Sequence, residues 1–126
     1  MIQTMLEHSK GVNINSKELA KLCARIADSK KGENIVILDV DELSSVASYF
    51  VICSGRIDKH VRAIADEIED RLRAKKIYLF HSDRDQVTHW IVLDYLDVIV
   101  HVFDQEKRDY YRLESLWGDA EEIEWK

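Results

Sequence analysis

The residues best suited to chemistry in this chain include Asp94, Asp97 and His101, which lie close together in the sequence. Carboxylate and imidazole groups can bind a metal ion or exchange protons. A metal site would need a further spaced ligand, and acid–base catalysis would need a nucleophile and a substrate pocket that the sequence does not indicate. The simpler interpretation is that Asp97 stabilises a turn and His101 is hydrogen-bonded within a sheet. The acidic groups would then attract a basic partner, and Asp97 is expected to be the most exposed.

Asp39 and Asp41 form a second candidate, a D-x-D pair of the kind that holds a divalent ion in nucleotidyl transfer. That chemistry also needs a third carboxylate and a glycine-serine phosphate loop before the carboxylate strand. Here Ser54-Gly55 follows the strand, so the order is wrong. Carboxylates that cap a turn at a strand end explain the pair better. A metal-dependent, nucleotidyltransferase-like enzyme is kept as the alternative function, because the D-x-D pair is the one feature that favours it.

A β-hairpin from Trp90 to Phe103 is the element that would position the first group, because this is the longest β-rich run. If the chain reverses at Leu96-Asp97, Trp90 faces Phe103 and Val92 faces His101. Leu96 disfavours the positive φ of a tight turn, so a longer loop that pairs the strands differently stays open. The two faces of the hairpin would carry Ile91, Leu93, Tyr95, Val98, Val100 and Val102 on one side, and Trp90, Val92, Asp94, Ile99, His101 and Phe103 on the other.

Hydrophobic periodicity predicts the elements around this hairpin. A helix begins at Asn15, with Glu18 completing a capping-box variant, and ends at Gly32. A second helix follows Ser54-Gly55, and its apolar stripe is Val61, Ile64, Ala65, Ile68 and Leu72. Further strands are predicted over 34–40, 49–53 and 77–80, with a polar loop over 81–87.

A last helix, capped by Asp104, completes the predicted order of elements. Tyr111 and Arg112 are expected to point away from the sheet. The residues expected to pack on the sheet are Tyr110, Leu113, Leu116, Trp117 and Ala120. The order predicts a single α/β domain over 15–120, with a mixed, roughly five-stranded sheet packed with helices. An N-terminal arm, 1–14, and a C-terminal tail, 121–126, flank it.

Composition limits the classes of function. The 126 residues are 46% hydrophobic and 33% charged, which is ordinary for one soluble domain. No apolar run approaches the roughly 20 residues of a membrane helix, and the first residues do not resemble a secretory signal. Cys23 and Cys53 are expected to be free thiols in a reducing cytoplasm. The net charge of −6 argues against a phosphate clamp over the whole molecule and favours a basic protein partner.

Several ordered motifs give the chain a recognisable pattern: Asp39–Gly55, His60–Asp66, Trp90–Asp94, Asp97–Phe103 and Arg108–Ala120. Together they resemble the ribosomal silencing factor family, also called Iojap-like. The resemblance implies a nucleotidyltransferase-like shape without catalytic residues, and no cofactor. Members of this family bind the fourteenth protein of the large ribosomal subunit, block subunit joining, and lower translation in starvation or stationary phase. Some members are homodimers when free.

This sequence departs from the family pattern in two places. Leu96 stands where the family usually has glycine, and His81-Ser82 stands where Glu-Gly is common. The first departure concerns the geometry of the hairpin turn, and the second concerns the contacts of the loop before Trp90.

Trp90, with Phe103 beside it, is the predicted anchor for a partner, because large aromatic residues next to polar groups typify interface hot spots. The competing interpretation is a tryptophan packed in the core. The full set of predicted partner-binding residues is Trp90, Phe103, Asp94, Tyr95, Asp97, His101 and Tyr111. A basic cluster of Lys107, Arg108 and Arg112 is either a solvated face or a minor contact to ribosomal RNA.

Overall fold

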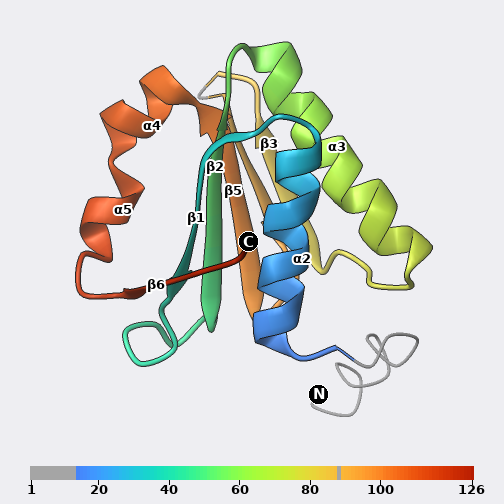
Figure 1. Cartoon of the computed structure of the whole chain (residues 1–126). Coiled ribbons are helices and arrows are strands. Elements are labelled where there is room, and N and C mark those ends of the chain that lie inside the picture. The colour runs from blue at the N-terminus through green and yellow to red at the C-terminus, as the bar shows by residue number, and fades with distance from the viewer. Residues whose placement is uncertain (1–13, 88) are drawn as a thin grey trace.

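The chain folds into a mixed sheet with helices on both faces (Figure 1). This computed structural model describes residues 14–87 and 89–126. The sheet has six strands in the order β3-β4-β5-β2-β1-β6, and within it β2 and β5 pair in parallel. The elements are α2 (Ser16–Ser29), β1 (Glu33–Asp39), β2 (Tyr49–Gly55), α3 (Asp58–Ala74), β3 (His81–Asp85), β4 (Trp90–Asp94), β5 (Val98–Asp104), α4 (Gln105–Tyr111), α5 (Leu113–Leu116) and β6 (Glu121–Ile123). The predicted single-domain α/β fold with a mixed sheet is confirmed, with six strands in place of roughly five.

Helices α2 and α3 lie side by side over one face of the sheet (Figure 1). Asn15 caps α2 as predicted, because its Oδ1 accepts a hydrogen bond from the Glu18 backbone N–H at 2.8 Å. The apolar stripes of both helices pack on the face of the hairpin that the sequence predicts to be apolar. None of the helices in these described ranges has both the length and the apolar character to cross a membrane. The predicted N-terminal arm lies outside the described residues, except for Ile14, which packs against this core.

The hairpin of β4 and β5 has the predicted register. Trp90 pairs with Phe103, and Val92 pairs with His101. The turn is tight although it lacks glycine, and Leu96 takes a positive φ of 75°. The Asp94 carboxylate accepts a hydrogen bond from the Leu96 N–H at 2.8 Å and so stabilises this conformation. The longer loop that the sequence left open does not occur.

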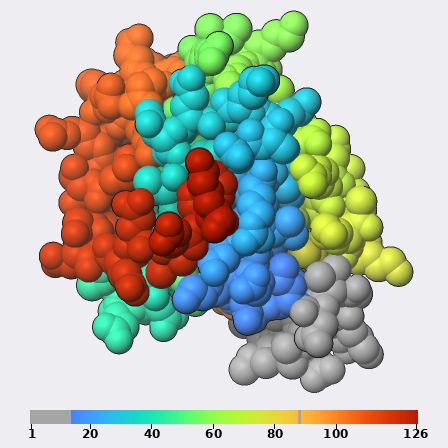
Figure 2. Space-filling model, viewed as in Figure 1, coloured from blue at the N-terminus to red at the C-terminus, as the bar shows by residue number. Residues whose placement is uncertain are grey.

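The edge strands differ from the prediction. The strand expected over 77–80 is wrong, since the chain extends at His81–Asp85 instead and pairs antiparallel with β4. An edge strand pairs on one side only and tolerates a polar, exposed sequence, which explains why periodicity misses it. Residues 121–126, expected as a tail, include β6, which pairs with β1. Trp125 then donates a hydrogen bond to the Ile35 carbonyl, and Figure 2 shows the C-terminal residues lying against α2.

The last helix is broken. Arg112 adopts the left-handed conformation, with φ 51° and ψ 45°, and separates α4 from α5. Tyr110, before the break, and Leu116, after it, are each 75% exposed, so their predicted packing on the sheet is wrong. Tyr111, expected to point away, packs against the sheet and contacts Trp90 instead. Leu113 is buried, and Trp117 makes an edge contact with Phe50 at 5.2 Å between ring centroids. Helices α4 and α5 lie on the face opposite α2 and α3 (Figure 1).

Candidate partner-binding surface

The part of the sheet formed by β3 and β4 stays open on the side of α4, because α4 packs on β5 and β2. Directly opposed residues of an antiparallel pair share a face. Trp90 lies opposite Asp85, Val92 opposite Asp83, and Asp94 opposite His81. We call this set, His81, Asp83, Asp85, Trp90, Val92 and Asp94, the β3–β4 face. On this face a partly exposed indole and a partly exposed valine lie among carboxylates.

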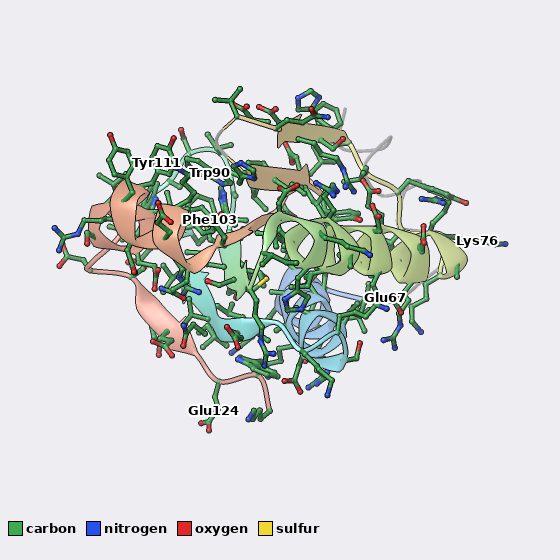
Figure 3. All side chains as sticks on the ribbon, turned by 90° about the horizontal axis from the view of Figure 1, so that it is seen from above. Glu67, Lys76, Trp90, Phe103, Tyr111 and Glu124 are labelled. Atoms are coloured by element: carbon green, nitrogen blue, oxygen red, sulfur yellow. The ribbon has the colours of Figure 1, made fainter. Side chains whose placement is uncertain are left out.

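Trp90 stands at the border of this face, supported by other rings. Its ring stacks on Phe103 with centroids 5.2 Å apart and an interplanar angle of 30°, and it contacts Tyr111 at 5.1 Å. Figure 3 shows the three side chains gathered from β4, β5 and α4. Phe103 is fully buried, whereas Trp90 and Tyr111 keep exposed surface. Phe103 therefore supports the indole from inside the molecule and offers no surface of its own.

His101 fixes the polar edge of the indole. The Trp90 Nε1–H donates to His101 Nδ1 at 3.1 Å. Burial lowers the pKa of His101 from 6.5 to about 4, so the ring is neutral near pH 7. Because Nδ1 accepts a hydrogen bond, the proton must reside on Nε2, which has no hydrogen-bond partner among the described residues. His101 is 7% exposed, so it holds Trp90 in place without presenting a surface.

The remaining predicted residues, Asp94, Asp97 and Tyr95, lie at different distances from Trp90 in the fold, and not all of them share its face. Asp94 is partly buried on the β3–β4 face and holds the hairpin turn. Asp97 is exposed at the end of the hairpin, where its carboxylate accepts a hydrogen bond from Ser16 Oγ at 3.0 Å. Tyr95 points to the opposite face, among the residues under α2 and α3, and burial raises the pKa of its hydroxyl. The structure thus brings Trp90, Asp94 and the supporting rings together but separates Tyr95 from them.

The predicted basic cluster is wrong for Arg108. Its side chain is 5% exposed and bonds to Glu114 and Ser54. Lys107 is partly buried, and Arg112 is exposed. A run of cations at neighbouring positions of a helix points in several directions, so such a run does not make a common surface.

The D-x-D pair has a local structural role. Asp39 Oδ1 accepts a hydrogen bond from the Asp41 N–H at 3.1 Å, and Asp41 Oδ1 accepts one from Ser48 Oγ at 2.9 Å. These bonds close the connection between β1 and β2, as expected of carboxylates that cap a turn. Within residues 14–87 and 89–126, no group of three or more His, Cys, Asp or Glu side chains is arranged to hold a metal ion.

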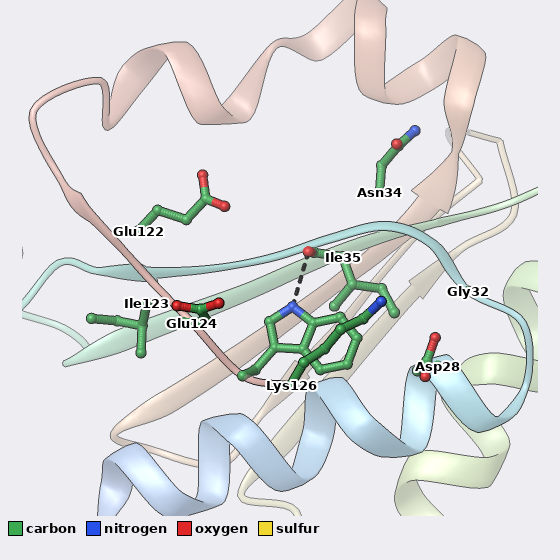
Figure 4. A pocket seen from close by; sticks show the side chains of 9 residues that line it. Asp28, Gly32, Asn34, Ile35, Glu122, Ile123, Glu124 and Lys126 are labelled. Carbon is green, nitrogen blue, oxygen red and sulfur yellow. Dashed lines mark hydrogen bonds between the residues drawn. The ribbon is translucent and has the colours of Figure 1, made fainter.

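A pocket lies elsewhere on the molecule, where the end of α2 meets β1 and the C-terminal residues (Figure 4). Trp125 crosses it, and its hydrogen bond to the Ile35 carbonyl is 3.2 Å long. Carboxylates of Asp28, Glu122 and Glu124 stand around it. None of the predicted partner-binding residues lines this pocket. The candidate site is therefore the open β3–β4 face, where an aromatic residue lies among polar groups as in protein interfaces.

The sequence did not identify His81, Asp83, Asp85 and Val92 as members of the site. Asp83 and Asp85 belong to β3, which the sequence presents as a polar loop. The available signal was the short polar segment that separates residues 81–85 from the strand at Trp90, a spacing typical of a hairpin. With that pairing, the alternation in β4 would have placed both carboxylates beside the indole.

The chain is similar to proteins of one family. It matches the family model described as "Ribosomal silencing factor during starvation" over residues 13–126. Ribosomal silencing factor RsfS of Bacillus subtilis (strain 168) is 43% identical over 107 residues, which are 85% of this chain and 91% of that protein. A crystal structure of a Chromobacterium violaceum protein has a TM-score of 0.79 at 30% identity, over 83% of this chain and 88% of that one. Another, from Bacillus halodurans, has a TM-score of 0.74 at 34% identity, over 86% and 99%. The chain therefore belongs to the ribosomal silencing factor family, which comprises ribosome-associated regulators of translation.

Proposed function

We propose that this protein represses translation by docking its β3–β4 face on the fourteenth protein of the large ribosomal subunit, in the cytoplasm of starved or stationary-phase cells. Docking there would occupy the surface on which the small subunit assembles, so the two subunits would not join. The observation that carries the proposal is the partly exposed indole of Trp90, held rigidly beside carboxylates on an open sheet face.

The geometry of Trp90 supports its role as the anchor. Interface hot spots are enriched in tryptophan, and a side chain that is already immobile loses little conformational entropy on binding. Stacking on Phe103, contact with Tyr111 and the hydrogen bond to His101 immobilise this indole in the free protein. A partner that covers it would gain apolar burial with little ordering cost.

The charge of the site supports a basic partner. Asp83 and Asp85 are exposed on β3, and the whole chain carries a net charge of −6. Complementary charge orients a partner and accelerates encounter more than it adds to affinity. In the proposed mechanism, Trp90 supplies the affinity and the carboxylates fix the orientation. Steric exclusion of the small subunit needs no chemical step and no cofactor.

The experiment is co-sedimentation of the purified protein with isolated large subunits. Trp90→Ala should leave the protein folded and soluble but abolish its co-sedimentation. Trp125→Ala is the matched control, because it removes a partly buried tryptophan that follows β6 and bonds to β1, away from the β3–β4 face. That variant should co-sediment like the parent.

A second measurement connects binding to repression. Mixing both ribosomal subunits with the parent protein should leave them separate, whereas mixing them with Trp90→Ala should yield assembled ribosomes. A pull-down with the isolated fourteenth protein tests the partner. Undiminished co-sedimentation of Trp90→Ala would rule out the β3–β4 face as the docking surface.

A further inference from the structure

We infer that Arg108 is a positioning residue, which locks α4 and α5 onto the sheet so that Tyr111 holds the Trp90 indole in its docking orientation. This inference rests on the proposed function in one respect, that Trp90 is the anchor. The fixed orientation of Trp90 itself can be tested without any partner.

The side chain of Arg108 makes three hydrogen bonds to two residues. Its Nε donates to Glu114 Oε1 at 2.7 Å, and its Nη2 donates to Glu114 Oε2 at 3.0 Å. Its Nη1 donates to Ser54 Oγ at 2.9 Å, and Ser54 is fully buried in β2. The planar guanidinium matches both carboxylate oxygens at once, which a lysine ammonium cannot do. One buried side chain therefore connects α4, α5 and the middle of the sheet.

The break at Arg112 makes this arrangement possible. In a continuous helix, residues six positions apart are separated by roughly 240° around the axis, so Arg108 and Glu114 would point in different directions. The left-handed conformation at Arg112 turns the chain, and Glu114 then meets the guanidinium. A non-glycine residue in this conformation is strained, and the bidentate ion pair is a local interaction that offsets the strain.

The ring contacts of Tyr111 connect the hydrogen bonds of Arg108 with Glu114 and Ser54 to Trp90. Tyr111 follows Arg108 by three positions on α4, so the two side chains project from neighbouring positions of one helical surface. Its ring lies 5.1 Å from that of Trp90. Beyond the break, Trp117 contacts Phe50 of β2. Helices as short as α4 and α5 are not stable alone, so their tertiary contacts determine where Tyr111 stands.

The two side chains of the ion pair differ in burial, and the variants for the test are chosen according to this difference. Arg108 is buried, whereas the Glu114 side chain is 40% exposed. Arg108→Met replaces the guanidinium side chain with an uncharged, apolar one of similar length, and it leaves Glu114 free to reach water. Glu114→Gln keeps one acceptor oxygen but removes the charge that compensates the buried guanidinium. Lys107→Met is the matched control, because it removes a neighbouring cation that makes none of these bonds.

The partner-free test uses the fluorescence of Trp90 in a Trp117→Phe/Trp125→Phe background, in which Trp90 is the sole tryptophan. Arg108→Met should remain folded by circular dichroism and should increase acrylamide quenching of Trp90. Arg108→Lys should give an intermediate increase, because it retains the charge without the bidentate geometry. Lys107→Met should leave quenching unchanged. A purely structural role for Arg108 would lower the urea midpoint without changing the quenching of the folded protein, and that result would overturn the inference.

The second test is affinity for isolated large subunits. Arg108→Met should weaken binding on the order of tenfold or more, with Arg108→Lys again intermediate. If Arg108→Met does not fold, Glu114→Gln takes its place in both tests with the same expected direction. Parent-like quenching and binding in the folded variant would refute the positioning role. Parent-like binding by Trp90→Ala would refute the proposed function instead, while the quenching result would still decide the inference.

Discussion

Mild acid should destabilise this protein through His101. The ring is buried beside Trp90, its Nδ1 accepts the indole N–H, and burial lowers its pKa from 6.5 to about 4. A protonated imidazole has no acceptor nitrogen, so protonation breaks this bond and leaves a cation among aromatic rings. The folded state therefore resists a proton that the unfolded chain accepts readily.

The size and sign of the effect follow from linkage. Above pH 6.5 the imidazole is neutral in both states and contributes no pH dependence. As the pH falls from 6.5 towards about 4, only the unfolded state gains the proton, so the free energy of unfolding decreases by about 1.4 kcal/mol for each pH unit. The loss amounts to about 2 kcal/mol near pH 5 and levels off at about 3 kcal/mol below pH 4. Such a loss is a large fraction of the stability of a small domain.

The assay is urea unfolding of the parent and of His101→Gln at about pH 7 and about pH 5. The glutamine amide oxygen can still accept a hydrogen bond from the indole, but it does not titrate. The carboxylates common to both proteins contribute equally, so the difference between the two pH dependences isolates His101. The parent should lose about 2 kcal/mol more than the variant over this interval. Equal losses would refute the assignment of a buried, neutral imidazole.

Two further substitutions test the turn and the acidic edge of the site. Leu96→Gly should raise the free energy of unfolding by up to about 1 kcal/mol, because glycine adopts the positive φ of 75° at that position without strain; an unchanged or lower urea midpoint would show that the leucine side chain contributes more than its backbone costs. Asp83→Lys should slow association with large subunits and reduce its salt dependence without lowering stability, because this exposed carboxylate lies beside Val92 on the β3–β4 face. Asp70→Lys on α3 is the matched control, and an equal effect in both variants would indicate only a dependence on net charge.

The β4–β5 hairpin could be predicted from the sequence because its alternation has one consistent solution. A shift of one residue would move Ile91 and Leu93 to the open face, so burial fixes the register that pairs Trp90 with Phe103. Asn15 and Asp104 could be predicted as helix caps for a similar local reason, since each needs only a backbone N–H three residues ahead.

The parts that could not be predicted depend on contacts between distant residues. Nothing near Arg108 in the sequence indicates that Ser54 will meet its guanidinium, because that contact forms only when α4 folds onto β2. The break at Arg112 lacks the glycine that usually marks a left-handed residue. Strand β3 lies at the edge of the sheet, where a polar sequence is tolerated, so hydrophobic periodicity does not reveal it. Its register with β4 was needed to place Asp83 in the site.

The unequal covering of the two faces explains why Trp90 stays partly exposed. A helix with its side chains is about 10 Å wide and so covers about two strands, which lie about 4.8 Å apart. On one face, α2 and α3 lie side by side and contact β1, β2, β5 and β4 between them. On the other, α4 contacts only β2 and β5 among the strands with several contacts, and α5 follows it along the chain (Figure 1). Because α4 packs on β2 and β5, the strands left open are those at the β3 edge, and the indole of Trp90 stands where the cover ends. The break at Arg112 ends α4 directly after Tyr111, whose ring contacts the indole, so the helical cover of this face stops beside Trp90.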